Sequence, residues 1–148
     1  MSAFREAFAR ARDAGDWQAC MAAIPYANWL GLRAVTVDNE VLVQLAYDDR
    51  NIGNPSLPAL HGGVMGALLE MCALFEILYR AESTLIPKMI TFTVDYVRPA
   101  RAIDTFARAT IVRHGRRIAT VRAEAWQDDR TKPVAIATAH MLVLPAES

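Results

Sequence analysis

The feature that most constrains the fold is the stretch from Gly62 to about Glu82, which is predicted to be a long helix with apolar residues on almost every face. Other elements must bury such a helix on several sides, because a surface helix carries one apolar stripe only. The longest apolar run within it, residues 64–77, is interrupted by Glu70 and Glu76 and is too short to cross a bilayer. We therefore expect a buried core helix and no contact with a membrane.

Segments rich in β-branched and aromatic residues supply the layer that would cover this helix. Residues 32–47 predict a hairpin that turns at Asp38-Asn39. Four further strands are expected at residues 88–96, 103–113, 117–127 and 134–144. This order favours the α+β class, with a largely antiparallel, curved sheet around the helix.

The remaining segments complete one domain of 148 residues. Residues 1–23 form an N-terminal helical segment, with a break near Gly15 and an end at Pro25, and residues 24–145 form the core. Residues 48–60 are rich in Gly, Pro and Asn, so we expect a loop that resists both helix and sheet.

Composition excludes several classes of partner. Sixteen basic residues balance sixteen acidic ones, which gives no field that would attract nucleic acid. The hydrophobic fraction of 53% suits a chain whose surface is partly covered by another copy, so we expect a homo-oligomer.

The cysteines and the N-terminus bear on the compartment. Cys20 and Cys72 lie among apolar neighbours on predicted helices, as buried free thiols do in a reducing compartment. The N-terminus lacks the basic start and apolar run of a secretory signal, so we expect the cytoplasm. Cys72 as a nucleophile is a weak alternative, because no base stands at a helical spacing from it.

The chemistry centres on the run His61-Gly62-Gly63 at the predicted start of the long helix. The first backbone N–H groups of a helix point outward without partners, at its positive end. Glycines allow a substrate to approach these N–H groups closely, and the groups can stabilise negative charge on a carbonyl oxygen. The run is typical of an oxyanion hole built from Gly62 and Gly63.

Glu70 stands eight residues after Gly62, on nearly the same face of the helix. Its neighbours are apolar, and burial among them would raise its pKa and so make the carboxylate a stronger base or nucleophile. The alternative is that Glu70 pairs with a basic residue inside the oligomer, or merely reaches solvent. Glu76 is expected on the surface near the helix end.

The three histidines do not form a standard metal site. His61, His114 and His140 have no Cys or carboxylate at ligand spacing, so we expect neither a metal nor another cofactor. His140 on an alternating strand fits the core or an interface. For His61 we prefer a role in orienting the loop, since the start of a helix disfavours the charged imidazole that a general base would form.

The turn formed by His114, Gly115, Arg116 and Arg117 has two interpretations. Arginines at a loop usually form a solvated rim. Paired arginines are also chemically suited to grip phosphates, which makes His114, Arg116 and Arg117 candidates for binding coenzyme A.

Taken together, these motifs resemble the hotdog-fold thioesterases of the phenylacetate and hydroxybenzoyl-CoA type. The resemblance covers residues 24–145 and rests on four features: His61-Gly62-Gly63, the acid at Glu70, Pro99-Ala100, and the Gly115-Arg116 turn. It implies the hotdog fold and a homodimer or a dimer of dimers with active sites at the subunit interface.

The resemblance also implies residue roles. The N–H of Gly62 would polarise the thioester carbonyl, and Glu70 of the other subunit would act as nucleophile or as base on water. His61 would hold the loop, and Gly63 would contact the substrate.

Two positions depart from the family pattern. Pro55 stands where relatives carry an Asn or Gln, so Asn54 beside it becomes our candidate, with Asn51 further back. Leu74 replaces a Ser or Thr after the acid, which leaves Thr91 or Thr93 as candidates for substrate contact. The acyl group is expected to contact apolar residues of the helix and the next strand, namely Met65, Leu69, Phe75, Phe92 and Tyr96.

These expectations define the leading hypothesis and its alternatives. The leading one is hydrolysis of an acyl-CoA thioester with an aromatic or medium-chain acyl group, in which coenzyme A is part of the substrate. A non-catalytic acyl-CoA or ligand-binding protein on the same fold is the second. An acyl-thioester dehydratase is the third, and it is disfavoured because it needs a His base within a different local motif.

Overall fold

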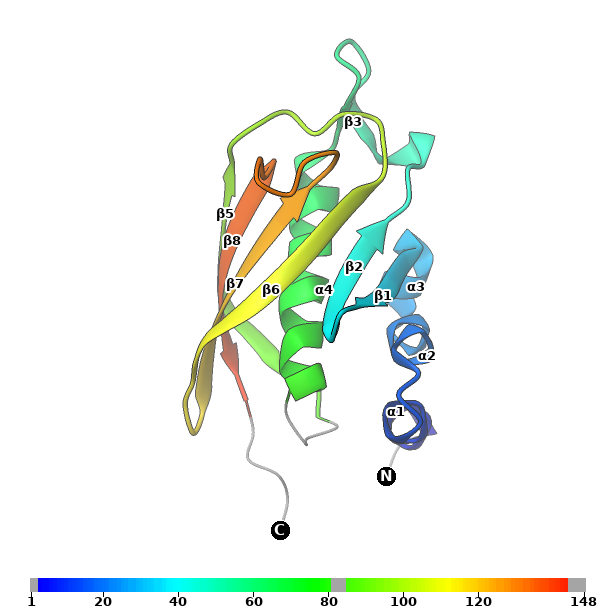
Figure 1. The fold of residues 1–148 in the computed structure, drawn as a ribbon, viewed down its shortest axis with the longest axis vertical. Helices are drawn as coiled ribbons and strands as arrows, with labels where there is room; N and C mark the ends of the chain where they lie inside the picture. The colour runs from blue at the N-terminus through cyan, green and yellow to red at the C-terminus, as the bar shows by residue number, and fades with distance from the viewer. Residues whose placement is uncertain (1–2, 81–84, 144–148) are drawn as a thin grey trace.

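A six-stranded antiparallel sheet curves around the long helix α4 in the computed structural model, which describes residues 3–80 and 85–143 (Figure 1). The strands lie in the order β1-β2-β6-β7-β8-β5. Their bounds are β1 Leu32–Val37, β2 Glu40–Leu45, β5 Lys88–Tyr96, β6 Thr105–His114, β7 Ile118–Trp126 and β8 Ala135–Leu142. The predicted α+β class and hotdog arrangement are confirmed. The predicted ends at Glu82 and Leu144 lie outside the described residues.

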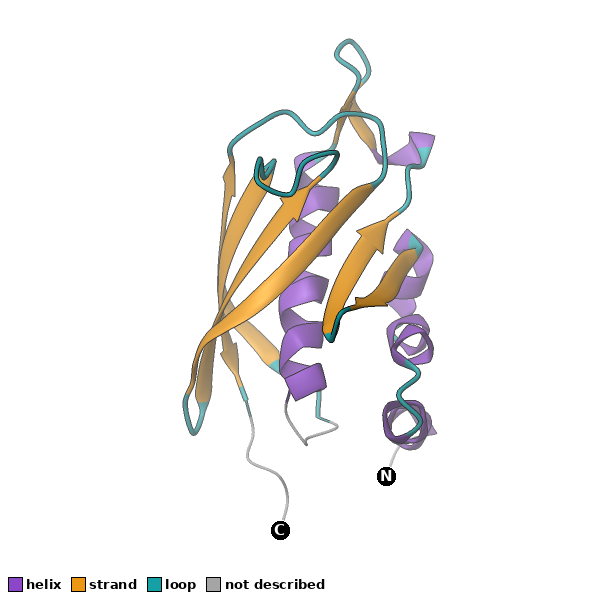
Figure 2. Cartoon of the chain, in the orientation of Figure 1, coloured by secondary structure: helices purple, strands orange, loops and turns teal. Residues whose placement is uncertain are grey.

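Helix α4 (Gly62–Arg80) lies against the concave face of this sheet and forms the centre of the core (Figure 2). Twelve of its nineteen residues are buried. The positions of the central strands that face it are mostly alanines: Ala107, Ala109, Ala119, Ala123, Ala125, Ala135, Ala137 and Ala139. Small side chains on the sheet leave room for the Leu, Met and Phe side chains of the helix, so the two layers pack closely.

Length and composition alone would let α4 cross a membrane. The sheet that wraps it accounts for that composition, because a core helix buried on several sides is apolar all round.

The hairpin and the break in the N-terminal helices follow the prediction. Asp38 and Asn39 both adopt positive φ angles, 48° and 64°, as the tight turn between β1 and β2 requires. Helices α1 (Ala3–Asp13) and α2 (Trp17–Ala23) are separated at Gly15, whose φ of 70° ends α1.

The sequence led us to expect that the helical region ends at Pro25, but it does not. Pro25 begins a third helix, α3 (Pro25–Leu30), because the first turn of a helix does not need the N–H group that proline lacks. Gly31, with a φ of 72°, ends α3 in the left-handed conformation.

The segment 48–60 is also more ordered than predicted. It contains a short 3-10 helix, η1 (Asp49–Asn51), and a two-stranded ribbon of β3 (Ile52–Asn54) and β4 (Ala59–Leu60). Asp48 starts η1 by accepting a hydrogen bond from the Arg50 N–H, which composition alone did not reveal.

Glu76 was expected on the surface, yet its side chain is only 11% exposed. Arg80 stands one turn later and donates to the Glu76 carboxylate at 2.9 Å. The ion pair offsets the cost of covering the carboxylate.

The two edges of the sheet differ. At β1, the side-chain oxygen of Gln18 in α2 accepts a hydrogen bond from the Ala34 N–H at 2.8 Å, so the N-terminal helices cover this edge. At β5, no element of residues 3–80 and 85–143 pairs with the outer side of the strand. The β5 edge is therefore available to another chain.

Phe8 tests whether the N-terminal helices fold together with the sheet. The ring is fully buried in the same core cluster as α4, so we expect Phe8→Ala to lower the free energy of unfolding by about 3 kcal/mol. Urea denaturation followed by circular dichroism measures this change. Val112→Ala, at a side chain that is 65% exposed, serves as the control and should stay within about 0.5 kcal/mol of wild type. An unchanged unfolding free energy for Phe8→Ala would show that residues 3–23 are a dispensable attachment.

Candidate active site

The start of α4 is built around His61. Its Nδ1 atom accepts a hydrogen bond from the Gly63 N–H at 2.8 Å, and its carbonyl oxygen accepts from Val64 and Met65. His61 is thus the N-cap of α4, and its ring is held in an orienting position. The Gly63 N–H is already hydrogen-bonded in this cap. None of the described residues accepts a hydrogen bond from the Gly62 N–H.

The preceding ribbon is fixed tightly to His61. The His61 N–H donates to the carbonyl oxygen of Asn51 at 2.8 Å, and the Leu60 N–H donates to that of Ala100 at 2.9 Å. A Cβ atom on Gly53 would lie 2.6 Å from the His61 Cα, so only glycine permits this close approach. The backbone that carries the oxyanion candidate is therefore rigidly placed.

Gly62, Gly66 and Glu70 form a stripe on one face of α4. The Tyr96 hydroxyl of β5 donates to the Gly62 carbonyl at 2.8 Å. A Cβ atom on Gly62 would lie 3.3 Å from the Tyr96 ring, and one on Gly66 would lie 4.0 Å from Phe92. This stripe therefore faces the edge strand β5 rather than the middle of the sheet.

Glu70 is not buried within one chain, so the condition under which it would become a stronger base or nucleophile is not met there. It is partly exposed, and its carboxylate has no hydrogen bond or ion pair within residues 3–80 and 85–143. The reason is its place on the stripe beside β5, where the sheet ends. At 1.5 Å per residue, Glu70 also lies about 12 Å along the axis from Gly62.

Asn51 and Asn54 occupy different surroundings. Asn54 is exposed, and its side-chain oxygen accepts a hydrogen bond from the Ser56 N–H at 3.0 Å within its own turn. Asn51 is only 6% exposed, and its Nδ2 has no acceptor in the described part of the chain. The amide that lies beside His61 with a free donor is that of Asn51.

A cavity of about 340 Å³ opens between α3 and the start of α4. Asn51, His61 and Gly63 line one side of it, and Tyr26 and Trp29 line the other. Nothing in the sequence connected α3 with this site, although Tyr26 and Trp29, three residues apart, could have been recognised as an aromatic pair on one helix face.

The candidates for phosphate binding lie elsewhere in the chain. His114, Arg116 and Arg117 belong to the hairpin between β6 and β7, at the end of the sheet opposite the start of α4 (Figure 1). The ten residues of β6 span about 30 Å. One chain therefore does not bring this hairpin to His61 and Gly62.

Thr91 also lies away from the start of α4. Along β5 it alternates with Phe92, which faces α4, and it pairs with His140 on the sheet face turned away from the helix. On that face the His140 Nδ1 and the Thr120 hydroxyl lie 3.0 Å apart. Thr93, two residues from Thr91, shares its face. An irregularity at residues 89–91 shifts which residues of β5 face the helix. The sequence alone did not reveal this shift.

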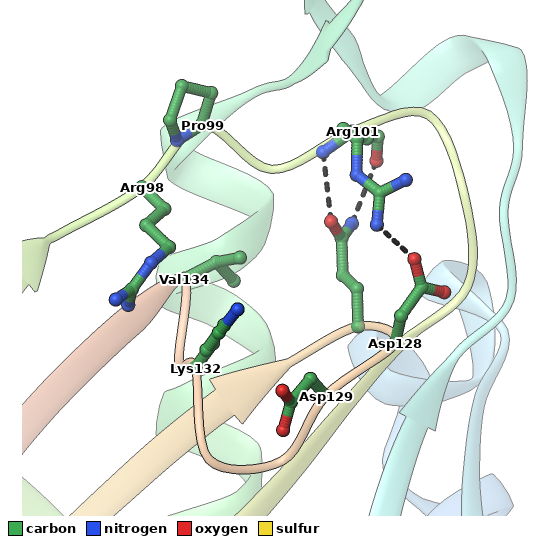
Figure 3. A pocket seen from close by; sticks show the side chains of 8 residues that line it. Arg98, Pro99, Arg101, Asp128, Asp129, Lys132 and Val134 are labelled. Carbon is green, nitrogen blue, oxygen red and sulfur yellow. Dashed lines mark hydrogen bonds and ion pairs between the residues drawn. The ribbon is translucent and has the colours of Figure 1, made fainter.

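A basic pocket lies at the same end of the molecule as the start of α4 (Figure 3). It has a volume of about 290 Å³, and three of its lining residues are Arg98, Arg101 and Lys132. Arg101 pairs with Asp128, and Arg98 donates to the Pro133 carbonyl at 2.7 Å.

The pocket also carries an acidic residue that stays ionised. Hydrogen bonds from the Thr131 hydroxyl and N–H hold the pKa of Asp129 below its ordinary value, and the charges of Lys132 and Arg98 add to this effect. The basic groups thus share the pocket with two carboxylates, those of Asp128 and Asp129.

The expected acyl-contact residues divide into two groups. Met65, Leu69 and Phe75 are at most 2% exposed and are packed into the core, so they line no open space in this structure. Phe92 and Tyr96 lie at the β5 edge, next to the glycine stripe.

Cys72 does not suit the role of nucleophile. Both cysteines are buried free thiols, as predicted, and burial raises the pKa of Cys72 far above its ordinary value. Within the described ranges, no three His, Cys, Asp or Glu side chains are grouped so that they could hold a metal ion.

Comparison with known proteins gives consistent matches. A family model described as the acyl-CoA thioesterase N-terminal domain matches residues 54–142. The medium/long-chain acyl-CoA thioesterase YigI of Salmonella typhimurium is 28% identical over 135 residues, which cover 81% of this chain and 86% of that protein.

Solved structures agree in fold over almost the whole chain. A Chromobacterium violaceum protein is 36% identical with a TM-score of 0.78, and the match covers 96% of this chain and 99% of that one. A phenylacetic acid degradation-related protein of Ralstonia eutropha is 26% identical with a TM-score of 0.75, over 92% and 99% of the two chains.

Proposed function

Because the chain belongs to the acyl-CoA thioesterase family, we propose that it hydrolyses acyl-CoA at a site shared by two copies of the chain. The activity itself, hydrolysis of an acyl-CoA thioester, follows from the family. The residues that perform it, the acyl group and the arrangement of subunits are our proposal, which the following geometry supports.

The observation that carries the proposal is the free Gly62 N–H at the positive end of a 19-residue helix. His61 engages the neighbouring Gly63 N–H, so Gly62 is the donor left for a substrate. A thioester carbonyl oxygen that accepts from Gly62 gains charge during attack, and a fixed donor stabilises that charge.

The separation of Gly62 and Glu70 supports a site formed by two chains. A group that attacks a carbonyl carbon must come within about 3 Å of it, whereas about 12 Å separates these two residues along α4. The proposal therefore places Glu70 of a second copy opposite Gly62. The uncovered β5 edge supports a two-fold pairing that would set the two glycine stripes beside each other.

In this arrangement the partner's Glu70 acts in one of two ways. As a base, it takes a proton from water while the water oxygen bonds to the thioester carbon. As a nucleophile, its own oxygen bonds to that carbon, and water later opens the anhydride. In both cases the C–S bond breaks, and the CoA thiolate leaves and takes up a proton.

Asn51 is the amide that we assign to the site in place of Asn54. Its buried Nδ2 has no acceptor in the described part of the chain and lies in the cavity beside His61, where it can donate to the substrate carbonyl or to the attacking water. The binding-only alternative drew its support from the missing Asn or Gln at Pro55, and the position of Asn51 weakens that support.

We assign the CoA phosphates to the basic pocket of Arg98, Arg101 and Lys132 rather than to the β6–β7 hairpin. The Leu60 to Ala100 hydrogen bond joins the two segments that carry the pocket and the start of α4. Anions favour a pocket that holds three cationic side chains against two carboxylates. We further propose a cytoplasmic protein, which the two free thiols suit.

Glu70→Gln should lower kcat at least 100-fold, because the amide can neither take a proton nor form the anhydride. Release of thiol from phenylacetyl-CoA and decanoyl-CoA, followed with a chromogenic thiol reagent, measures this. Glu6→Gln, at an exposed residue of α1, is the matched control and should keep full activity. Full turnover in Glu70→Gln, with unchanged circular dichroism, would refute the mechanism.

Asn51→Ala should lower kcat about 100-fold, whereas Asn54→Ala should leave it unchanged. The same thiol-release assay compares the two variants, with thermal melting as a check on folding. Co-expression of Asn51→Ala with Glu70→Gln should restore turnover, because one mixed site then combines an intact Asn51 with an intact partner Glu70. Absence of any recovery would argue against a site shared between chains.

Lys132→Ala should raise KM about fivefold with little change in kcat, because it removes a charge that contacts phosphate but no reacting atom. Arg116→Ala serves as the comparison, since it removes a cation at the far hairpin, and its KM should match wild type. If KM rose in Arg116→Ala and stayed at the wild-type value in Lys132→Ala, the phosphates would instead contact the β6–β7 hairpin of a neighbouring copy.

A further inference from the structure

Two large aromatic side chains of α3 stand exposed at the edge of the cavity that adjoins the start of α4. Tyr26 is 52% exposed and Trp29 is 58% exposed. Their rings lie 5.9 Å apart, with only 14° between their planes, so they form one continuous aromatic wall. Exposed aromatic surface of this size is costly in water and is typical of a binding surface.

Arg50 contacts the wall through both the main chain and the ring of Trp29. Its guanidinium donates to the Trp29 carbonyl at 2.6 Å and lies 4.9 Å from the centre of the Trp29 ring. Asp48 fixes the other side of the guanidinium at 3.3 Å. A surface that is ordered before the ligand arrives loses little conformational entropy on binding.

The opposite wall consists of groups that we assigned to the reaction. Asn51, His61 and Gly63 line the same cavity. The buried Nδ2 of Asn51, which lacks an acceptor within residues 3–80 and 85–143, is an independent sign that a ligand atom belongs there.

Apolar side chains complete the lining, namely Leu30, Ile52 and Val64. The volume of about 340 Å³ falls in the range of small-molecule sites. The other side of the helix start is already occupied, because the Tyr96 ring lies 3.3 Å from where a Gly62 Cβ would be. A chain attached to a carbonyl at Gly62 therefore finds open apolar space on the α3 side.

We propose that the cavity between α3 and the start of α4 receives the acyl group, and that Trp29 and Tyr26 are its specificity-determining residues. The ligand class is an apolar acyl group, either a medium-length aliphatic chain or an aromatic ring that stacks on the wall. This proposal rests on the proposed function for the position of the thioester carbonyl. It gives helix α3 a part in substrate selection.

Kinetics with two acyl lengths test the proposal. In Trp29→Ala, kcat/KM for decanoyl-CoA should fall about tenfold while that for acetyl-CoA stays unchanged, because acetyl is too short to reach the wall. The Arg50 bond to the Trp29 carbonyl survives this change, since it involves the main chain only. Val112→Ala, an exposed apolar residue on β6, should leave both values as in wild type. An equal fall for both substrates, or no fall for decanoyl-CoA, would overturn the proposal.

Binding to Glu70→Gln protein separates this proposal from the proposed function. Decanoyl-CoA should change the fluorescence of Trp29, free CoA should not, and Trp29→Phe should abolish the change. If wild type released no thiol but this pattern held, the mechanism would fail and the acyl cavity would stand. If free CoA gave the same signal, or neither ligand gave one, the cavity would not be the acyl site.

Discussion

The fold depends on one constraint, which is that α4 is apolar on nearly every side and must be wrapped. The central strands meet it with a surface made mostly of alanine, so that bulky residues of the helix, such as Leu68 and Phe75, fill the space between the layers. The curvature of the sheet, the antiparallel strand order and the N-terminal helices on the β1 side all serve to cover this helix.

The wrapping is incomplete on one face, and the candidate site lies there. Glycines replace bulky residues at positions 62 and 66, and the first carboxylate follows at Glu70, where the sheet ends at β5. That carboxylate has no partner within residues 3–80 and 85–143, and residue 70 lies about 12 Å along the helix axis from Gly62. The incomplete covering of the helix is thus the physical basis on which we propose a site shared by two chains.

Periodicity predicted most of the secondary structure because burial and alternation are properties of the local sequence. The predicted strand 88–96 coincides with β5, and the long helix begins at Gly62 as expected. Pro25 was misjudged because proline suits both the residue after a helix and the first residue of one. The face of the sheet on which Thr91 lies, and the end of the sheet at which the hairpin of Arg116 lies, could not be read from the sequence, because both depend on tertiary structure. The contact of these two residues with substrate stays a prediction.

The candidate amide near His61 is the clearest case in which spacing along the sequence does not predict proximity in the fold. Asn51 and His61 are ten residues apart in sequence, yet the Asn51 carbonyl accepts a hydrogen bond from the His61 N–H at 2.8 Å. The ribbon of β3 and β4 projects the intervening residues outward and brings its two ends together, and the absence of a side chain at Gly53 lets them close. Insertions in a hairpin of this kind lengthen the sequence between two functional groups without separating them in space. A spacing rule therefore favours Asn54, whose side chain bonds within its own turn, whereas the contacts of the folded chain are the basis on which we propose Asn51.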